Sequence, residues 1–99
     1  MKTAVITGGA KGIGAAVTKK LSSLGYATVA VYLHSESAAL ALSEHVIKDG
    51  GDSFVLHCDV RDPESVKRTV ETILRMNGSV DVLVNNAGIA RQQLFQSRH

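Results

Sequence analysis

The sequence predicts an α/β protein built on a parallel, doubly wound sheet. Four short apolar segments that suit strands alternate with three segments of helical periodicity. The first apolar segment passes directly into a glycine-rich turn, and a helix begins within that turn. Right-handed crossovers then predict a Rossmann-like sheet with the strand order 3-2-1-4, in which the glycine-rich turn lies where the order reverses.

The bulk properties indicate a small globular domain. Ninety-nine residues, of which 44% are hydrophobic and 20% charged, allow one domain with a limited core. A net charge of +2 with scattered Lys and Arg argues against nucleic-acid binding. The single Cys58 excludes an internal disulfide, and the sequence shows neither a signal-peptide layout nor an apolar stretch of membrane-spanning length. We therefore expect a cytoplasmic protein.

The first strand is expected over residues 3–6, which are apolar after Thr3, as in a strand covered on both faces. From Gly12 the spacing becomes helical. The expected buried face of this helix carries four apolar residues at intervals of four, four and three, namely Ile13, Val17, Leu21 and Leu24. Gly25 is expected to end the helix as a C-terminal cap residue.

The second strand is expected over residues 27–33 and the third over residues 53–58. Between them, a helix over about 37–48 is stopped by the glycines at 50 and 51. The packing positions expected for this helix are Leu40, Val46 and Ile47.

The third helix has a strong start signal, because Asp62 suits the N-cap and Pro63 the first turn. Asn77-Gly78 is expected to close it. Its expected buried stripe consists of Val66, Val70, Ile73 and Leu74. The fourth strand is expected over 80–84, where an uncovered apolar edge would favour aggregation and a further strand would cover it in a complete fold.

The domain is expected to span residues 1–90 and to be incomplete. Residues 91–99 form a polar tail without periodicity, which we expect to be poorly ordered.

Residues 7–14 read Thr-Gly-Gly-Ala-Lys-Gly-Ile-Gly. Glycine permits positive φ and leaves no Cβ in the path of a phosphate oxygen. The helix that follows directs N–H groups and the positive end of its dipole at an anion. The turn therefore predicts a site for a dinucleotide pyrophosphate, although its Gly-x-x-x-Gly-x-Gly spacing differs from the commonest fingerprint, Gly-x-Gly-x-x-Gly.

Three motifs together resemble the short-chain dehydrogenase/reductase family. The turn is similar to its Thr-Gly-x-x-x-Gly-Ile-Gly, Asp59-Val60 to its adenine-side acidic pair, and residues 85–88 to its Asn-Asn-Ala-Gly. The resemblance extends to about Gln96 and is strongest to the 3-oxoacyl-carrier-protein reductase branch. It implies an NADP(H)-dependent carbonyl reductase that transfers hydride to a 3-oxoacyl thioester or a similar, acyl-carrier-bound substrate.

The resemblance also implies coenzyme-binding roles for residues of all three motifs. The turn residues that would line the pyrophosphate and the adenosine ribose are Gly8, Lys11, Gly12, Ile13 and Gly14. Asp59 and Val60 would contact the adenine, with the Asp59 carboxylate accepting a hydrogen bond from the exocyclic amine. The residues that would border the adenine ribose are Asn86, Ala87 and Gly88. A structural alternative stays open, in which the side chains of Asn85 and Asn86 tie the sheet to the turn.

The end of the second strand favours NADP(H) over NAD(H). A carboxylate there would bind both ribose hydroxyls and repel a 2′-phosphate, but residues 32–35 read Tyr-Leu-His-Ser and no acid precedes Glu36. Lys11 can reach a 2′-phosphate, Ser35 can donate a hydrogen bond to it, and a protonated His34 would add charge. Glu36 would come into range if the strand end shifted by one residue, so NAD(H) stays open.

No metal site is expected. His34, His45 and His57 share no ligand spacing. His57 and Cys58 are adjacent on a predicted strand and therefore point to opposite faces. Cys58 is expected to be a small core residue.

No catalytic residue is assigned in this sequence. In the family a serine and a Tyr-x-x-x-Lys protonate the carbonyl as hydride arrives, and they lie beyond position 99. Four residues after Tyr26 and Tyr32 stand Ala30 and Glu36, not lysine.

We therefore interpret the chain as the N-terminal part of a reductase, shortened by a gene break, a frameshift or the form in which it was expressed. We expect it to bind NADP(H) weakly and to reduce nothing alone, and the complete enzyme to be a homo-oligomer. The alternatives are a non-catalytic nucleotide-binding module and a fragment without independent activity.

Overall fold

The computed structural model describes residues 1–86 as a four-stranded parallel sheet with three helices. The strands, in chain order, are β1 (Thr3–Thr7), β2 (Ala27–Tyr32), β3 (Ser53–His57) and β4 (Val82–Asn85). The helices are α1 (Gly12–Ser23), α2 (Glu36–Lys48) and α3 (Pro63–Asn77). The spatial order β3-β2-β1-β4 confirms the predicted topology. The predicted tail, 91–99, lies outside the described residues.

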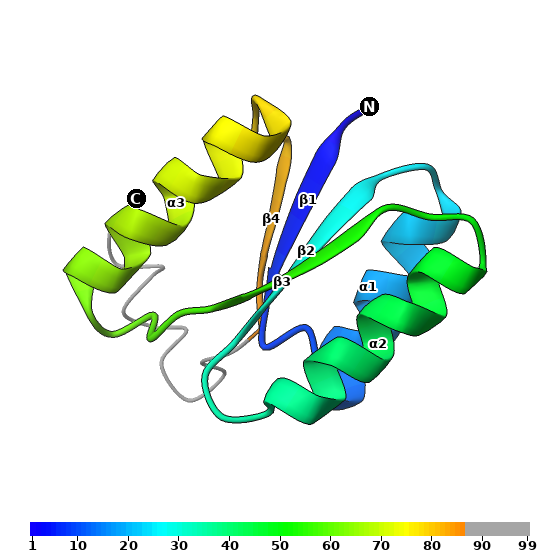
Figure 1. Ribbon diagram of the computed structural model, residues 1–99, viewed down its shortest axis with the longest axis horizontal. Helices are drawn as coiled ribbons and strands as arrows, with labels where there is room; N and C mark the ends of the chain where they lie inside the picture. Colours follow the sequence, from blue (N-terminus) through cyan, green and yellow to red (C-terminus); the bar gives the residue numbers. More distant parts are fainter. Residues whose placement is uncertain (87–99) are drawn as a thin grey trace.

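The three helices cover opposite faces of the sheet (Figure 1). Helices α1 and α2 lie on one face and α3 on the other. This follows from the handedness of the crossovers: the chain moves outward from β1 to β3 through α1 and α2, and α3 then carries it back to β4 on the far side of β1. The carboxyl ends of β1 and β4 therefore lie side by side where the order reverses, with Thr7 paired to Asn85.

The core lies on both faces of β1 and β2, which confirms that these strands are covered on both sides. On the α3 face the buried cluster consists of Val5, Val29, Val31, Cys58 and Ile73. On the α1 and α2 face it consists of Ala30, Leu42 and Val46. Cys58 is therefore a core residue, as predicted.

The buried face predicted for α1 is wrong at both ends. Ile13 is 68% exposed and Leu24 62% exposed, whereas Gly14 and Thr18 are buried. The reason is close approach: α1 lies so near the sheet and the glycine turn that small residues occupy its contact face. The predicted end of the helix is confirmed, because Gly25 follows it with φ +97°.

The predicted faces of α2 and α3 are also only partly right. Leu40 and Ile47 are more than half exposed, and the buried residues of α2 are Ala39, Leu42, Ser43 and Val46. On α3, Ile73 is buried and Val66 packs against the core, but Val70 and Leu74 are exposed. Each helix buries only the narrow stripe of residues that contacts the sheet, and its neighbouring apolar residues remain exposed to solvent.

Several element boundaries differ from the prediction by one or two residues, as is common at element ends. Strand β2 ends at Tyr32 and β3 at His57, one residue earlier than expected in each case. Strand β4 begins at Val82, two residues later than expected, and the backbone N–H of the preceding Asp81 donates to the Thr3 carbonyl over 2.9 Å. Of the helices within residues 1–86, none combines the length and apolar character needed to cross a bilayer.

Candidate dinucleotide-binding site

The glycine turn lies at the carboxyl edge of the sheet, between the ends of β1 and β4. Gly8 has φ +65° and Gly12 has φ +55°, a left-handed backbone conformation that favours glycine. The Gly8 N–H donates to the Val31 carbonyl over 2.9 Å, which fixes the start of the turn against β2. A Cβ built on Gly12 would meet open space within 4 Å among the described residues, so the turn is open on that side.

Two other glycines allow α1 to approach the turn. A Cβ on Gly14 would overlap the Gly8 carbonyl oxygen and lie 2.7 Å from Asn86 Nδ2. A Cβ on Gly9 would lie 2.9 Å from the Ile6 carbonyl oxygen. The buried Thr18 hydroxyl lies 2.8 Å from the Gly14 carbonyl and 3.3 Å from that of Gly9, which joins the helix to the turn. Gly14, predicted to line the pyrophosphate, is thus buried beneath the turn.

The first turn of α1 offers an environment suited to an anion. It consists of Gly-Ile-Gly-Ala and carries no acidic side chain. Lys11 occupies the N-cap position with an extended backbone, and both Lys11 and Ile13 are exposed. Because N–H groups and the positive end of the dipole converge at a helix start, this geometry suits the binding of a phosphate.

The two asparagines tie β4 to the glycine turn. The Thr7 hydroxyl donates to Asn85 Oδ1 over 3.2 Å and accepts from the Asn86 backbone N–H over 2.9 Å. Asn86 Nδ2 donates to the Gly8 carbonyl over 3.2 Å. The structural alternative weighed for these residues is therefore what the structure shows. Ala87 and Gly88 lie outside the described residues.

Asp59 and Val60 follow β3 at the same edge of the sheet. Asp59 Oδ1 accepts hydrogen bonds from the backbone N–H and the Nε of Arg61, each over 3.0 Å, and Oδ2 accepts from Nη2 over 3.1 Å. These hydrogen bonds hold the pKa of Asp59 below its ordinary value and raise the pKa of Arg61. Val60 is half-buried and packs against the α3-side core. Sequence reasoning missed Arg61, whose signal was an arginine two positions after the strand-end aspartate.

At the end of β2, the Tyr32 hydroxyl donates to Glu36 Oε2 over 3.3 Å. The Tyr32 ring also meets the His57 ring edge-on, with centroids 5.6 Å apart. Loss of solvation, followed by the Glu36 carboxylate, raises the pKa of Tyr32. Ser35 is the N-cap residue of α2, and its carbonyl accepts from the Ala39 N–H over 2.9 Å. Ser35 and Lys11 thus begin adjacent helices at one edge of the sheet.

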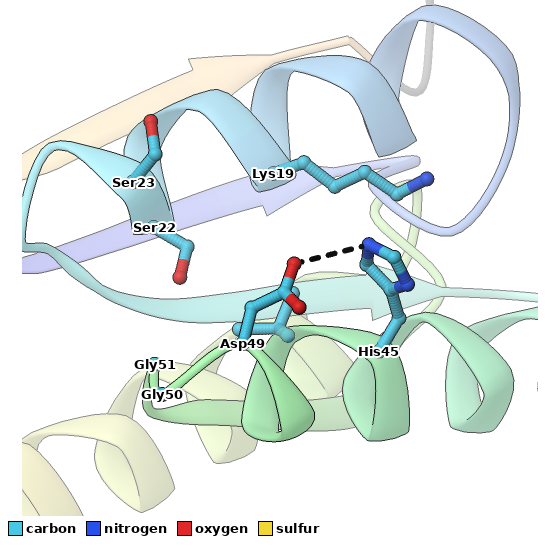
Figure 2. A pocket seen from close by; sticks show the side chains of 8 residues that line it. Lys19, Ser22, Ser23, His45, Asp49, Gly50 and Gly51 are labelled. Carbon is cyan, nitrogen blue, oxygen red and sulfur yellow. Dashed lines mark ion pairs between the residues drawn. The ribbon is translucent and has the colours of Figure 1, made fainter.

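The structure also contains cavities between the helices and against the sheet. A cleft of about 200 Å³ separates the C-terminal ends of α1 and α2; Figure 2 shows Lys19 and Ser22 facing His45 and Asp49 across it. His45 Nε2 and Asp49 Oδ2 are 3.3 Å apart. Because helix C-termini carry partial negative charge, this cleft does not suit phosphate.

Within residues 1–86, no three His, Cys, Asp or Glu side chains gather as a metal site.

The second cavity, of about 360 Å³, lies between α3 and the sheet and is almost wholly apolar. The residues that line it include Val5, Val31, Val60, Ile73 and Leu83. It lies on the face of the sheet opposite α1, and its lining reaches Thr7 and Asn85 at the carboxyl ends of β1 and β4.

Comparison with known proteins agrees with this geometry. The chain is 39% identical over 94 residues to 3-oxoacyl-[acyl-carrier-protein] reductase FabG of Staphylococcus aureus, covering 95% of this chain and 38% of that protein. It is 38% identical over 90 residues to the short-chain dehydrogenase/reductase homolog YusS of Bacillus subtilis, covering 91% of this chain and 83% of YusS.

Solved structures share the fold. A metagenomic short-chain oxidoreductase in complex with NADP superimposes with a TM-score of 0.83 at 34% identity, covering 89% of this chain and 39% of that one. The sequence model of the family described as short chain dehydrogenase matches residues 2–98. The chain spans 38% of the length of the FabG relative and thus corresponds to one part of it. The chain belongs to the short-chain dehydrogenase family of oxidoreductases.

Proposed function

We propose that this chain is the NADP(H)-binding part of a reductase that acts on a 3-oxoacyl thioester. The observation that carries the proposal is the glycine turn against α1. Gly8 and Gly12 have positive φ, and a Cβ on Gly12 would meet no described residue within 4 Å. The first turn of α1 begins beside them without an acidic side chain. A pyrophosphate needs a backbone approach free of Cβ atoms and N–H groups directed at it, and these residues fit both needs.

Those residues proposed to hold the dinucleotide that the structure describes lie along one edge of the sheet. The turn and the start of α1 would bind the pyrophosphate through Gly8, Lys11, Gly12, Ile13 and, by close packing, Gly14. Asp59 and Val60 would contact the adenine, and Ser35 would meet a 2′-phosphate. Asn86, Ala87 and Gly88 would border the ribose. The bound dinucleotide supplies the hydride; this part of the protein binds and orients it.

The preference for NADP(H) over NAD(H) is supported by charge. Lys11 is exposed at the start of α1, and Glu36, the first acid after β2, has its carboxylate engaged by the Tyr32 hydroxyl. The metagenomic neighbour is in complex with NADP. Calorimetric titration of this chain with NADPH and NADH tests the preference: tighter binding of NADPH is expected, and tighter binding of NADH would overturn it.

The substrate class is supported by the 39% identity to FabG. NADPH oxidation with an acetoacetyl thioester tests the activity. We expect this chain to bind NADPH without turnover, because neither of its tyrosines, Tyr26 and Tyr32, is followed by lysine at the fourth position.

The second candidate is a nucleotide-binding module without turnover, favoured by the 83% coverage of YusS. Turnover by a form extended through the family's Tyr-x-x-x-Lys would separate the reductase from the module. A cytoplasmic location and a homo-oligomeric whole enzyme remain predictions.

A further inference from the structure

Arg61 holds the Asp59 carboxylate at three points. Oδ1 accepts from the Arg61 backbone N–H and from Nε, and Oδ2 accepts from Nη2, all at 3.0–3.1 Å. The backbone is held as well, because the Asp59 N–H donates to Ser65 Oγ over 3.1 Å. The side chain of the aspartate is therefore held by Arg61, which precedes α3, and its backbone by Ser65, in the first turn of α3.

This arrangement leaves Asp59 one acceptor position with a fixed direction. A carboxylate offers about four lone-pair positions, two on each oxygen. Arg61 occupies both positions on Oδ1 and one on Oδ2. The fourth position, on Oδ2, accepts no hydrogen bond from the described residues 1–86, and the Asp59 side chain is 30% exposed, so a ligand can reach it.

The remaining position on Oδ2 can accept a hydrogen bond but cannot donate one. The Arg61 hydrogen bonds favour the ionised carboxylate, which has no proton to donate. An ionised carboxylate accepts a hydrogen bond from an amino group and repels a carbonyl oxygen. Asp59 lies beyond the carboxyl end of β3, at the edge where the proposed function places the adenine.

We propose that Arg61 is a positioning residue, which aims the remaining acceptor position of Asp59 at the exocyclic amine of adenine. The pair thereby selects an amino purine over the corresponding oxo purine. This inference rests on the proposed function, because it requires that the dinucleotide bind with its adenine beside β3. It adds a residue, Arg61, and a basis for discriminating between bases.

The test compares binding of NADPH with binding of its hypoxanthine analogue, in which a carbonyl oxygen replaces the amine. Calorimetry on the wild-type chain is expected to show a preference for the adenine form of about tenfold, the value of one charge-assisted hydrogen bond. Arg61→Ala is expected to reduce that ratio to about one to threefold. Arg61→Lys keeps the charge but not the planar fork, so it should restore the ratio in part.

Two further variants serve as a charge control and as a direct test of the Asp59 carboxylate. Arg75→Ala removes the same charge at the far end of α3 and should leave the ratio at the wild-type value. Asp59→Asn places an amide that can donate and should favour the hypoxanthine analogue. Circular dichroism of each variant checks that it is folded.

The outcomes separate the two proposals. If the folded wild-type chain binds neither dinucleotide, the proposed function is overturned, and this inference falls with it. If the wild-type chain binds but Arg61→Ala weakens both ligands equally, Arg61 is merely structural and the positioning role is wrong. If the preference for NADPH over its hypoxanthine analogue is unchanged in both Arg61→Ala and Asp59→Asn, the base does not bind beside Asp59.

Discussion

Gly14 shows at the scale of one residue why the turn needs glycine inside the helix as well as at its bends. A methyl group there would overlap the Gly8 carbonyl oxygen and crowd Asn86 Nδ2 at 2.7 Å. Gly14→Ala should therefore push α1 away from the turn. We expect a loss of about 1–3 kcal/mol in the free energy of unfolding, typical of overpacking, and weaker NADPH binding. Urea unfolding and calorimetry measure the two effects.

A matched control for this substitution lies in the same helix. Ala16 is exposed, so Ala16→Met adds more atoms to α1 without directing them at the turn. Methionine is a good helix former, and the change should cost less than about 0.5 kcal/mol. A Gly14→Ala variant as stable as Ala16→Met would contradict the close-approach role.

Asp81 joins the start of β4, at the edge of the described sheet, to the start of β1. Its Oδ2 accepts from the Thr3 backbone N–H over 2.8 Å and from the Ser79 hydroxyl over 3.0 Å. The Thr3 hydrogen bond is the largest cause that lowers the pKa of Asp81 from its ordinary value of 3.8. Since the folded pKa lies below the unfolded one, ionised Asp81 stabilises the fold above pH 3.8, and this contribution is lost as the pH falls through the folded pKa.

Asp81→Asn removes this titration and provides a test at the scale of one residue. The variant should be less stable than the wild type at neutral pH, and the gap should narrow once the pH is below 3.8. Urea unfolding of both proteins at neutral and at acidic pH measures the gap directly. A gap of equal size at both pH values would show that the charge of Asp81 contributes nothing.

At the scale of the element, α3 begins at a cap predicted from local sequence. Asp62 Oδ1 accepts from the Glu64 N–H over 3.1 Å, and Pro63 occupies the first turn. Asp62→Ala should lower the free energy of unfolding by about 1 kcal/mol. Glu71→Ala removes the same charge from the exposed middle of α3 and should cost less than about 0.5 kcal/mol. Equal losses in the two variants, measured by urea unfolding, would argue against the cap.

The elements also show what sequence could and could not predict. Strands, caps and the glycine turn depend on neighbours in sequence, so Asp62, Gly78 and the alternation of elements were readable directly. The buried faces of α1 and α2 were not, because the contact that selects Thr18 over Ile13 is with the turn and the sheet. Arg61 was missed although it stands only two positions after Asp59, because the local loop conformation, which turns its guanidinium onto the carboxylate, is not specified by the residue types alone.

At the scale of the whole molecule, the two faces of the sheet are covered unequally. Helices α1 and α2 share one face, whereas α3 alone covers the other and leaves the apolar cavity of about 360 Å³. Strand β4 forms one edge of the described sheet, pairing with β1 on its inner side. Leu83, at the middle of this strand and in the cavity wall, is 65% exposed. Within residues 1–86, apolar surface and backbone groups without a strand partner therefore coincide along β4.

Such an edge favours pairing between chains, and a lysine there is a common natural means of preventing it. We expect the wild-type chain to associate as its concentration rises and the Leu83→Lys variant to remain monomeric. The variant should keep its NADPH affinity, because Leu83 lies on the face of the sheet opposite α1. Leu40→Lys makes the same change at a half-exposed leucine of α2, away from the edge, and should associate like the wild type. Sedimentation velocity over a concentration series distinguishes them: if both lysine variants associate equally, β4 is not the surface through which the chains meet.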